Sequence, residues 1–485
     1  MRRSLAFFLV LLLAAIVGMG TALAAILPAR DRVELTETVL YGDRAAAEGV
    51  AVRTRNTYDH YLFWDTVCAL GEELAVDTDY TFSASQIRER TPVTYGGIIM
   101  NNSFGLLSPD DPTADPTGLS AVYAQMMEEV QPSQKLRKEV YLKDYFTYYP
   151  LGGYLDLPAS GLSWSGTFTT DTTPEPGTEE YLVLAFQNFF RIPVLETETL
   201  ELTLTANASG DVTVYGYGSG PGDSYYMSSQ SVYTGDACYF TFDCHTQEGG
   251  MVDTSLIPGG YGVYRLPYLP EDAPGPGTSL EVGSRAARIK TDELAMVYPL
   301  DPEAVLLGLT LSPNQTKLLI HQRVENTYVL TVVDLADMTT LQRLEVADWP
   351  ETSYGGWFLY EGDDFLVPVL GWDRLVVLAL AEDGRYEIRF SAEATPPPAE
   401  GEEPLYDLDQ FAEMDYDGER LAVVRNLRHE RYSYFICDFS LAVYDPSGLI
   451  YFGEYANSLT PAGLSGNDHF DCLPMDHAPI SVRLD

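Results

Sequence analysis

Short runs in which apolar and polar residues alternate recur along most of this chain, and alternation with a period of two is typical of half-buried β-strands. The pattern is clearest between Val305 and Tyr455, where three successive segments each contain four such runs separated by polar stretches. The turns after the first run of each segment, at Ser312, Glu361 and Tyr416, follow one another at intervals of 49 and 55 residues. The pattern therefore predicts a recurring unit of four antiparallel strands.

Four-stranded units that recur every 40 to 50 residues or so are typical of the blades of a β-propeller. Three hairpins share a second feature, a strand followed by a short turn that contains an aspartate, at Asp334, Asp383 and Asp445. This feature resembles the outer hairpin of WD40-like and related bacterial surface β-propellers, over about residues 305 to 455. The Gly-His and Trp-Asp pairs of true WD40 repeats and the aspartate box of sialidase-type propellers are absent from the sequence. The resemblance therefore implies a shape and no activity.

Upstream of Val305 the sequence offers further strands without a constant period, among them Tyr181–Phe186 and a strand from Cys238 to Cys244. One segment near residues 117–131 departs from the pattern, because its apolar residues recur at helical spacing between two prolines. These residues are Leu119, Val122, Tyr123, Met126, Met127 and Val130. We predict a short helical insertion whose apolar face packs into the core, with a groove for a partner as the alternative.

Taken together, these patterns predict an all-β, β-propeller-like fold of about seven to eight irregular four-stranded blades. The Pro- and Gly-rich stretch 270–278 is expected to be a loop or linker between a β-rich part at residues 28–269 and a blade region at residues 279–485. We expect both parts to share one ring. The alternative is an N-terminal β domain that ends near residue 270, followed by a smaller β domain.

The N-terminus carries an export signal. Arg2 and Arg3 precede an uncharged apolar stretch over residues 5–27, and Ala22-Leu23-Ala24 within it has the small residues of a signal-peptidase site. The stretch is also long enough to span a bilayer, so residues 1–27 are either a cleaved signal peptide or a single N-terminal membrane anchor. The folded part lies outside the cytoplasm in both cases, because positive residues stay on the cytoplasmic side.

The net charge of the chain limits the kinds of molecule that it is expected to bind. A total of 29 Lys and Arg against 71 Asp and Glu gives a formal net charge of -42, which excludes nucleic acid as a partner. Hydrophobic residues make up 46% of the chain, enough for a large core. Five scattered cysteines are too few for a disulfide scaffold, so the core must supply the stability.

A cluster near the C-terminus contains the residue types that bind zinc or another divalent ion. Its candidate metal ligands are His469, Asp471, Cys472, Asp476 and His477. The spacing of a known structural zinc site is absent from the sequence, and a solvated tail or a closing strand is the alternative. We expect no cofactor other than a divalent metal at this cluster.

A second group of candidates could bind a sugar by stacking and hydrogen bonding. His60, Trp64 and Asp65 combine an imidazole, an aromatic ring and a carboxylate within six residues, and Trp357 and Trp372 add two further aromatic rings. The alternative for the first three is a half-buried strand edge whose polar groups are satisfied.

These observations favour an exported, non-catalytic protein of the cell surface that binds another surface protein or a wall glycan. The sequence lacks the motifs of serine hydrolases, zinc proteases, P-loop enzymes and kinases. A secreted hydrolase of glycan or peptide with a pair of carboxylates is one alternative, and a membrane-tethered sensor or assembly component is another. The oligomeric state is left open by the sequence.

Overall fold

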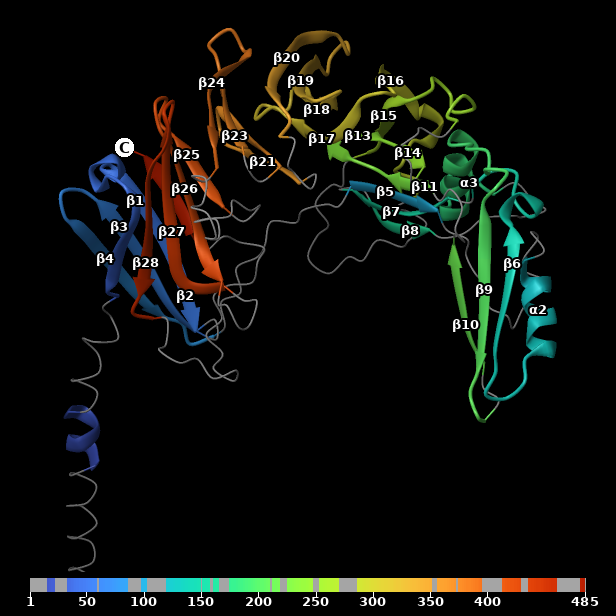
Figure 1. Cartoon of the computed structure of the whole chain (residues 1–485), viewed down its shortest axis with the longest axis horizontal. Helices are drawn as coiled ribbons and strands as arrows, with labels where there is room; N and C mark the ends of the chain where they lie inside the picture. The colour runs from blue at the N-terminus through green and yellow to red at the C-terminus, as the bar shows by residue number, and fades with distance from the viewer. Residues whose placement is uncertain are drawn as a thin grey trace, which may run out of the picture. The chain divides into compact units, whose positions relative to one another are not determined.

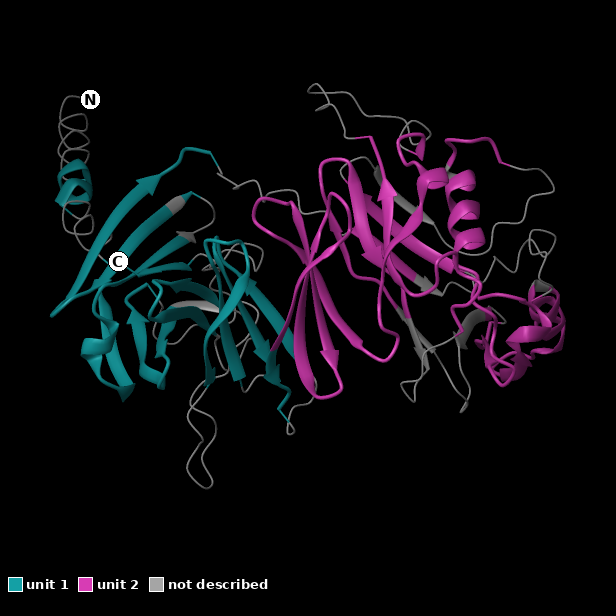
Figure 2. Cartoon of the chain, turned by 90° about the horizontal axis from the view of Figure 1, so that it is seen from above, with its two compact units in different colours: residues 1–92, 346–485 teal, residues 93–345 magenta. Residues whose placement is uncertain are grey.

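The computed structural model describes residues 15–21, 33–58, 61–85, 97–102, 119–149, 151–157, 160–164, 174–209, 212–218, 225–246, 253–269, 286–350, 356–371, 374–394, 412–428, 435–459 and 480–484. The chain forms two compact units, unit 1 from residues 1–92 and 346–485 and unit 2 from residues 93–345 (Figure 2). Within the described ranges, no helix is both long and apolar enough to cross a membrane. Residues 270–278 lie outside these ranges, so the expected loop or linker stays a prediction.

Each of the three segments predicted between Val305 and Tyr455 folds as an antiparallel sheet whose strands follow chain order (Figure 1). The sheets consist of β17 (Val305–Leu311), β18 (Lys317–Val324), β19 (Thr327–Asp334) and β20 (Thr340–Asp348); β21 (Trp357–Glu361), β22 (Phe365–Leu370), β23 (Arg374–Leu380) and β24 (Tyr386–Glu393); and β25 (Glu413–Tyr416), β26 (Leu421–Arg428), β27 (Phe435–Asp445) and β28 (Gly448–Asn457). The second and third sheets pack face to face, with Val367 and Val377 in the same buried cluster as Val423. Packed four-stranded sheets in chain order are the architecture of propeller blades, and the fold is all-β and propeller-like, as predicted.

Strands from the two ends of the chain complete sheets in unit 1. β1 (Leu35–Gly42) pairs with β28 and becomes the fifth strand of the third sheet. β29 (Ile480–Leu484) pairs with β2 (Val50–Tyr58), and β3 (Leu62–Leu70) and β4 (Leu74–Phe82) extend that sheet. β1 is therefore paired with a strand from the C-terminal part of the chain, and β29 with a strand from the N-terminal part.

A buried polar cluster fixes β1 in place. The Glu37 carboxylate accepts hydrogen bonds from the hydroxyls of Tyr451 (2.7 Å) and Tyr455 (3.2 Å) and pairs with Arg44 Nε at 2.6 Å. Both tyrosines are fully buried. Gly453 provides the space, because a Cβ at that position would lie 2.1 Å from the Tyr451 hydroxyl oxygen. The cluster joins residues that are 414 positions apart in the sequence.

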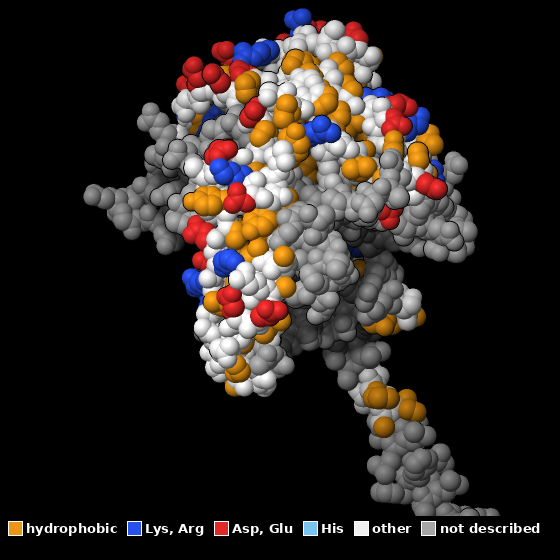
Figure 3. All heavy atoms as spheres, turned by 90° about the vertical axis from the view of Figure 1, so that its right-hand side faces the viewer, with side chains coloured by type: hydrophobic (Ala, Val, Ile, Leu, Met, Phe, Trp, Pro, Cys, Tyr) orange, Lys and Arg blue, Asp and Glu red, His pale blue; other side chains and the backbone are white. Residues whose placement is uncertain are grey.

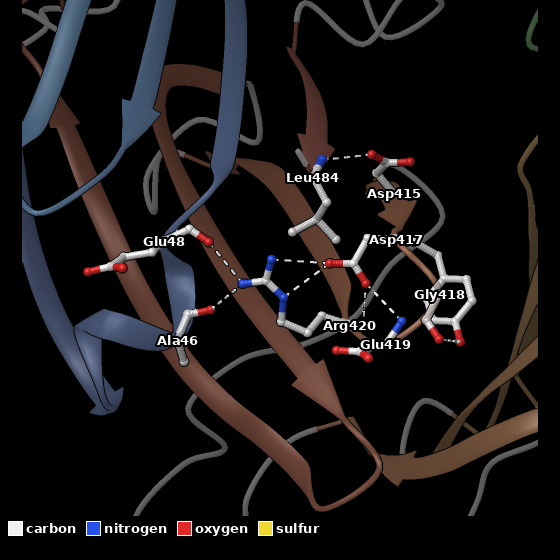
Figure 4. A network of polar contacts seen from close by, with 9 residues as sticks. Ala46, Glu48, Asp415, Asp417, Gly418, Glu419, Arg420 and Leu484 are labelled. Carbon is white, nitrogen blue, oxygen red and sulfur yellow. Dashed lines mark hydrogen bonds and ion pairs between the residues drawn. The ribbon is translucent and has the colours of Figure 1, made fainter.

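An arginine joins the third sheet to the connection between β1 and β2, which contains the 3-10 helix η1 (Arg44–Ala47) (Figure 4). Arg420 Nη1 donates to the carbonyl oxygens of Ala46 (3.2 Å) and Glu48 (2.9 Å), and its Nη2 pairs with Asp417 Oδ2 at 3.1 Å. Nearby, the backbone N–H of Leu484 on β29 donates to Asp415 Oδ2 at 2.7 Å. We call the set Arg420, Asp417, Ala46 and Glu48 the sealed junction.

Unit 2 has a fourth sheet in chain order and several smaller ones. The fourth contains β12 (Ser231–Tyr233), β13 (Ala237–Thr241), β15 (Gly262–Pro267) and β16 (Ala295–Pro299). The smaller sheets are β5 (Gly97–Asn102) with β7 (Leu151–Leu157) and β8 (Ser160–Trp164); β6 (Lys135–Tyr141) with β9 (Thr199–Ala206) and β10 (Val212–Gly218); and β11 (Tyr225–Ser228) with β14 (Asp243–Thr246). Short 3-10 helices, η3 (Leu142–Asp144) and η4 (Thr291–Glu293), lie in the connections. The described sheets of unit 2 are thus less regular than four-stranded blades throughout would require.

The predicted helix is present as α2 (Leu119–Glu129), and Leu119, Tyr123 and Met126 are buried with the apolar residues of β9. It packs into the core, so the core interpretation of its apolar face is confirmed. On the side of the molecule that carries α2 and β6, acidic and basic side chains are interspersed with apolar ones (Figure 3).

Two local predictions in unit 2 are wrong. Residues 181–186 lie in a helix, α3 (Glu179–Phe189), instead of a strand. A continuous apolar run does not distinguish the two, and here the Thr178 hydroxyl caps the helix by accepting from the N–H of Tyr181 at 3.2 Å. The single strand expected from Cys238 to Cys244 is divided into β13 and β14, which pair with different neighbours.

Candidate ligand-binding cleft

A cleft of about 570 Å³ opens between the sheet β12–β13–β15–β16 and the sheet β17–β20, within unit 2. Its volume is within the range of small-molecule sites, roughly 300 to 1,000 Å³. The lining residues are Thr234, Asp236, Tyr239, Arg265, Gln315, Thr316, Asp334, Leu335, Ala336 and Met338.

Three turns form the rim of the cleft. The turn from β12 to β13 contributes Thr234 and Asp236, and the turns from β17 to β18 and from β19 to β20 contribute the residues between 315 and 338. In an antiparallel sheet in chain order, the first and third turns lie at the same end, so these two turns are neighbours. The N–H of Leu335 donates to the carbonyl oxygen of Thr316 at 3.0 Å and joins them into one lip.

The floor of the cleft is a packed core. Tyr239 of β13, which is 5% exposed, belongs to a buried cluster with Val263 and with Leu318 of the opposite sheet. Leu335 and Met338 pack against the same cluster from the rim. The lining is therefore anchored on rigid strands rather than on loops alone.

Two lining residues have an unusual backbone conformation. Gln315 has φ 54° and Met338 has φ 58°, in the left-handed region that favours glycine. At the first and third turns of the sheet β25–β28, the residues with positive φ are Gly418 (φ 102°) and Gly448 (φ 117°). A side chain in this conformation costs about 1–2 kcal/mol. Among the residues that the structure describes, four non-glycine residues have this conformation: Gln315 and Met338 line the cleft, whereas Ser133 (φ 62°) and Glu325 (φ 53°) do not.

One cation and two carboxylates line the cleft. Arg265 Nη2 lies 3.5 Å from Asp236 Oδ2, with the two side chains 34% and 71% exposed, so the ion pair is weak and screened by solvent. The Thr234 hydroxyl donates to Asp236 Oδ1 at 2.9 Å. Asp334 Oδ1 accepts from the N–H of Ala336 at 2.8 Å. The cleft thus offers both donors and acceptors to a ligand.

The sugar-binding candidates predicted from the sequence lie elsewhere. Trp64 is only 5% exposed and packs against Tyr80, with ring centroids 5.4 Å apart, so it is a core side chain and offers no open stacking face. Asp65 lies on the next position of β3, with carboxylate–guanidinium distances of 3.7 Å to Arg53 and 3.6 Å to Arg55. β3 lies between β2 and β4, so these two residues are on an internal strand and the expected strand edge is wrong.

Trp357 begins β21 in unit 1 and is half-buried. His60 and Trp372 lie outside the described residues, as does the whole candidate metal cluster of His469, Asp471, Cys472, Asp476 and His477. Among the residues that the structure does describe, no group of three or more His, Cys, Asp or Glu side chains is arranged to hold a metal. The metal site stays a prediction.

No protein-family model matches this chain, and no curated protein matches its sequence. A solved structure of a protein from Lactobacillus plantarum has 8% identity and a TM-score of 0.26, covering 82% of this chain and 93% of its own. A gluconolactonase from Xanthomonas campestris has 15% identity and a TM-score of 0.21, covering 54% and 68%. TolB from Acinetobacter baumannii has 9% identity and a TM-score of 0.20, covering 84% and 79%. At TM-scores this low, the assignment of the fold rests on the strand order of the sheets.

A buried carboxyl group and a half-buried one bear on the hydrolase alternative. Glu198 is 4% exposed, and burial raises its pKa to about 7 although the Tyr149 hydroxyl donates to its Oε2. Burial also raises the pKa of Glu413, whose Oε2 accepts from the Tyr360 hydroxyl at 3.2 Å. Each is hydrogen-bonded to a tyrosine, and neither lines the cleft. The carboxylate pair of a hydrolase stays a prediction.

Proposed function

We propose that this chain is an exported, propeller-like binding protein that holds its ligand in the cleft between the sheets β12–β13–β15–β16 and β17–β20. The observation that carries the proposal is the pair of left-handed residues, Gln315 and Met338, at turns where another sheet of the same chain uses glycine. Their side chains line a cleft of suitable size together with groups that donate and accept hydrogen bonds.

The structure of the cleft floor favours the binding of a ligand. Its core-anchored floor is preformed, so a ligand does not have to order it, and preorganisation of this kind favours affinity. Export is supported by the apolar leader over residues 5–27. Mass spectrometry of the chain from the producing cell distinguishes the two forms of export, because a mature N-terminus at Ala25 means a cleaved signal peptide and an intact leader means an anchor.

A bulky side chain in the cleft tests the proposal. Ala336 is exposed on the rim, and its N–H donates to Asp334 Oδ1, so Ala336→Trp keeps the turn and fills the cleft. Ala45 is the matched control, because it is exposed in unit 1 and its N–H donates to Asp43 Oδ1 in the same kind of turn. Residues 28–485 of the wild type, A336W and A45W are applied to glycan and peptide arrays.

We expect the wild type and A45W to bind the same spots and A336W to lose at least tenfold in signal. Melting temperatures of the three proteins establish that each is folded. Binding that survives in A336W, or an absence of binding to both arrays, contradicts the proposal.

A further inference from the structure

We infer that the ligand of the cleft is a neutral saccharide. The inference rests on the proposed function, because it assigns a ligand class to the same cleft. It follows from three properties of the described lining: its charge, its hydrogen-bonding groups and its apolar surface.

The charges disfavour an anion. The chain has a net charge of -42, and its field repels anionic ligands at long range. Within the cleft, two carboxylates outnumber the single guanidinium of Arg265. An anionic ligand would therefore meet repulsion both on approach and at the site.

One of the two carboxylates already has a cationic partner, which disfavours a second cation beside it. Asp236 faces Arg265 at 3.5 Å and accepts from the Thr234 hydroxyl. Asp334 accepts from the N–H of Ala336. A cationic ligand would have to displace Arg265 from Asp236 and would then lie beside a second positive charge.

The polar groups suit hydroxyls. The guanidinium of Arg265 offers N–H donors in a plane, and Gln315 offers both an amide donor and an acceptor. The Thr316 hydroxyl donates to Asn314 Oδ1 at 2.8 Å and offers its oxygen as an acceptor. Neighbouring hydroxyls on a sugar ring each donate and accept, so they can bond to such groups at the same time. A ligand without hydroxyls or amides would leave these groups unsatisfied, which is costly once they are desolvated.

The apolar part of the lining suits the C–H face of a sugar ring. Leu335, Ala336 and Met338 line the same lip of the cleft as the polar residues Gln315, Thr316 and Asp334. A pyranose ring has an apolar face and a polar rim, so it can contact the apolar and the polar residues of this lip together. The volume of about 570 Å³ accommodates a short oligosaccharide rather than a single small ion.

The experiment compares ligands that differ in charge. Isothermal titration of residues 28–485 is performed with neutral cello-, malto- and chito-hexaose, with anionic hexagalacturonate and with cationic hexalysine, at 50 and 500 mM NaCl. A second readout is the methyl resonance of Met338 in protein with ¹³C-labelled methionine methyl groups, assigned with Met338→Leu. Arg265→Met is titrated in parallel, with Ala45→Trp as the control outside the cleft.

We expect at least one neutral hexaose to bind, to shift the Met338 resonance and to change less than twofold in affinity between the two salt concentrations, because screening acts on charge. Arg265→Met should weaken this binding at least tenfold and A45W should leave it unchanged. Binding of only hexalysine or only hexagalacturonate, with a shift of the Met338 resonance, overturns the saccharide assignment and leaves the cleft as the binding site. Binding of any of these ligands without a shift at Met338 contradicts both the assignment and the proposed function.

Discussion

An arginine–aspartate pair lies at the sealed junction and another lies beside the cleft, and the two arginines differ in how many protein acceptors they have. In unit 1, Arg420 and Asp417 are 26% and 21% exposed, and the guanidinium also donates to the carbonyl oxygens of Ala46 and Glu48 (Figure 4). In unit 2, Arg265 and Asp236 are 34% and 71% exposed and lie 3.5 Å apart beside the cleft. An arginine with several protein acceptors joins two parts of the structure, whereas one with a single loose partner keeps N–H donors available for a ligand.

The turns beside the sealed junction and beside the cleft also differ, in whether the residue with positive φ is a glycine or has a side chain. Beside the sealed junction, Gly418 takes the left-handed conformation without a side chain. Beside the cleft, Gln315 and Met338 take it with one. The left-handed conformation is free of strain at Gly418, whereas it costs stability at Gln315 and Met338, and also at Glu325 in the β18–β19 turn outside the cleft.

The largest expected effect is the difference in stability between substitutions of the two arginines. Arg420→Met leaves two carbonyl oxygens without their donor and removes the guanidinium partner of Asp417, which keeps the backbone N–H donors of Glu419 and Arg420. The variant should lower the free energy of unfolding of unit 1 by about 3 kcal/mol. Arg265→Met should lower the stability of unit 2 by less than about 0.5 kcal/mol, because an exposed ion pair contributes little. Hydrogen exchange of the β2 and β26 amides measures the first effect, and that of the β13 and β15 amides measures the second. Equal effects at the two sites would remove the distinction between the junctions.

A second comparison concerns buried carboxylates. Glu37 in unit 1 pairs with the charged guanidinium of Arg44, whereas Glu198 in unit 2 accepts a hydrogen bond from the neutral hydroxyl of Tyr149. The folded-state pKa of Glu198, about 7, lies above the unfolded value of about 4.3, so ionisation costs stability as the pH rises between these values. Glu198→Gln should therefore stabilise the protein by about 2–3 kcal/mol at pH 8 and have little effect at pH 4.

Glu37→Gln is the matched control, and it should destabilise the protein at pH 8 because Arg44 loses a charged partner. Denaturation in urea at pH 4, 6 and 8 measures both variants. A Glu198→Gln variant with no gain between pH 4 and pH 8 would show that the carboxyl is not held protonated.

The sheet on one side of the cleft should be sensitive to acid. His321 of β18 is fully buried between Thr310 (3.0 Å from Nε2) and the Tyr328 hydroxyl (2.7 Å from Nδ1), and burial lowers its pKa to about 3. Because the folded-state pKa lies below the unfolded value of about 6.5, stability is lost as the pH falls below that value. We expect a loss of about 2 kcal/mol at pH 5.

His321→Gln tests this effect, because glutamine does not titrate. The variant should be less stable overall, since it replaces only part of the hydrogen bonding, but its stability should change less between pH 7 and pH 5 than that of the wild type. Thermal melting at these two pH values provides the comparison, and parallel curves for the two proteins would contradict it.

The smallest expected effects lie in the turns. Gln315→Gly relieves the left-handed strain and should raise stability by up to about 1 kcal/mol, while it weakens ligand binding. Met338→Gly relieves the same strain but removes a side chain that packs against the core cluster, so it should raise stability by less than Gln315→Gly does. Gly418→Ala and Gly448→Ala should lower stability by about 1 kcal/mol through backbone conformation alone, because a Cβ at either position would contact nothing within 4 Å. Differential scanning calorimetry measures the shifts. A stabilising effect of either alanine substitution would contradict the assigned role of the turns.

The regular sheets were predictable because their strands are consecutive. Within each of the three sheets from β17 to β28, every strand pairs with its neighbour in the chain, so alternation and turn residues suffice. The pairings of β1 with β28 and of β2 with β29 were not predictable in this way, because an alternating strand does not specify a partner more than 400 residues away. α3 was missed because its apolar run also fits a strand, although Thr178 followed by Glu179 and Glu180 is a helix start.

The cleft was missed for a different reason. The candidate residues in the sequence were dense clusters of aromatic, acidic and imidazole groups. Trp64, a member of one such cluster, belongs instead to the core. Arg265, Asp236 and Gln315 are ordinary residues spread over some eighty positions, and the fold brings them to one cleft. A signal was present in the turns, since Gln315 and Met338 stand where the sheet β25–β28 has glycines.

The pairing of the chain's ends has a consequence for biosynthesis. Synthesis runs from the N-terminus, so β2, β3 and β4 leave the ribosome well before their partner strand, Ile480–Leu484, has been made. A nascent chain therefore cannot complete this sheet until residues 480–484 are synthesised. A chain that stops short of residue 480 lacks this strand and leaves the edge of β2 open to pairing with another chain.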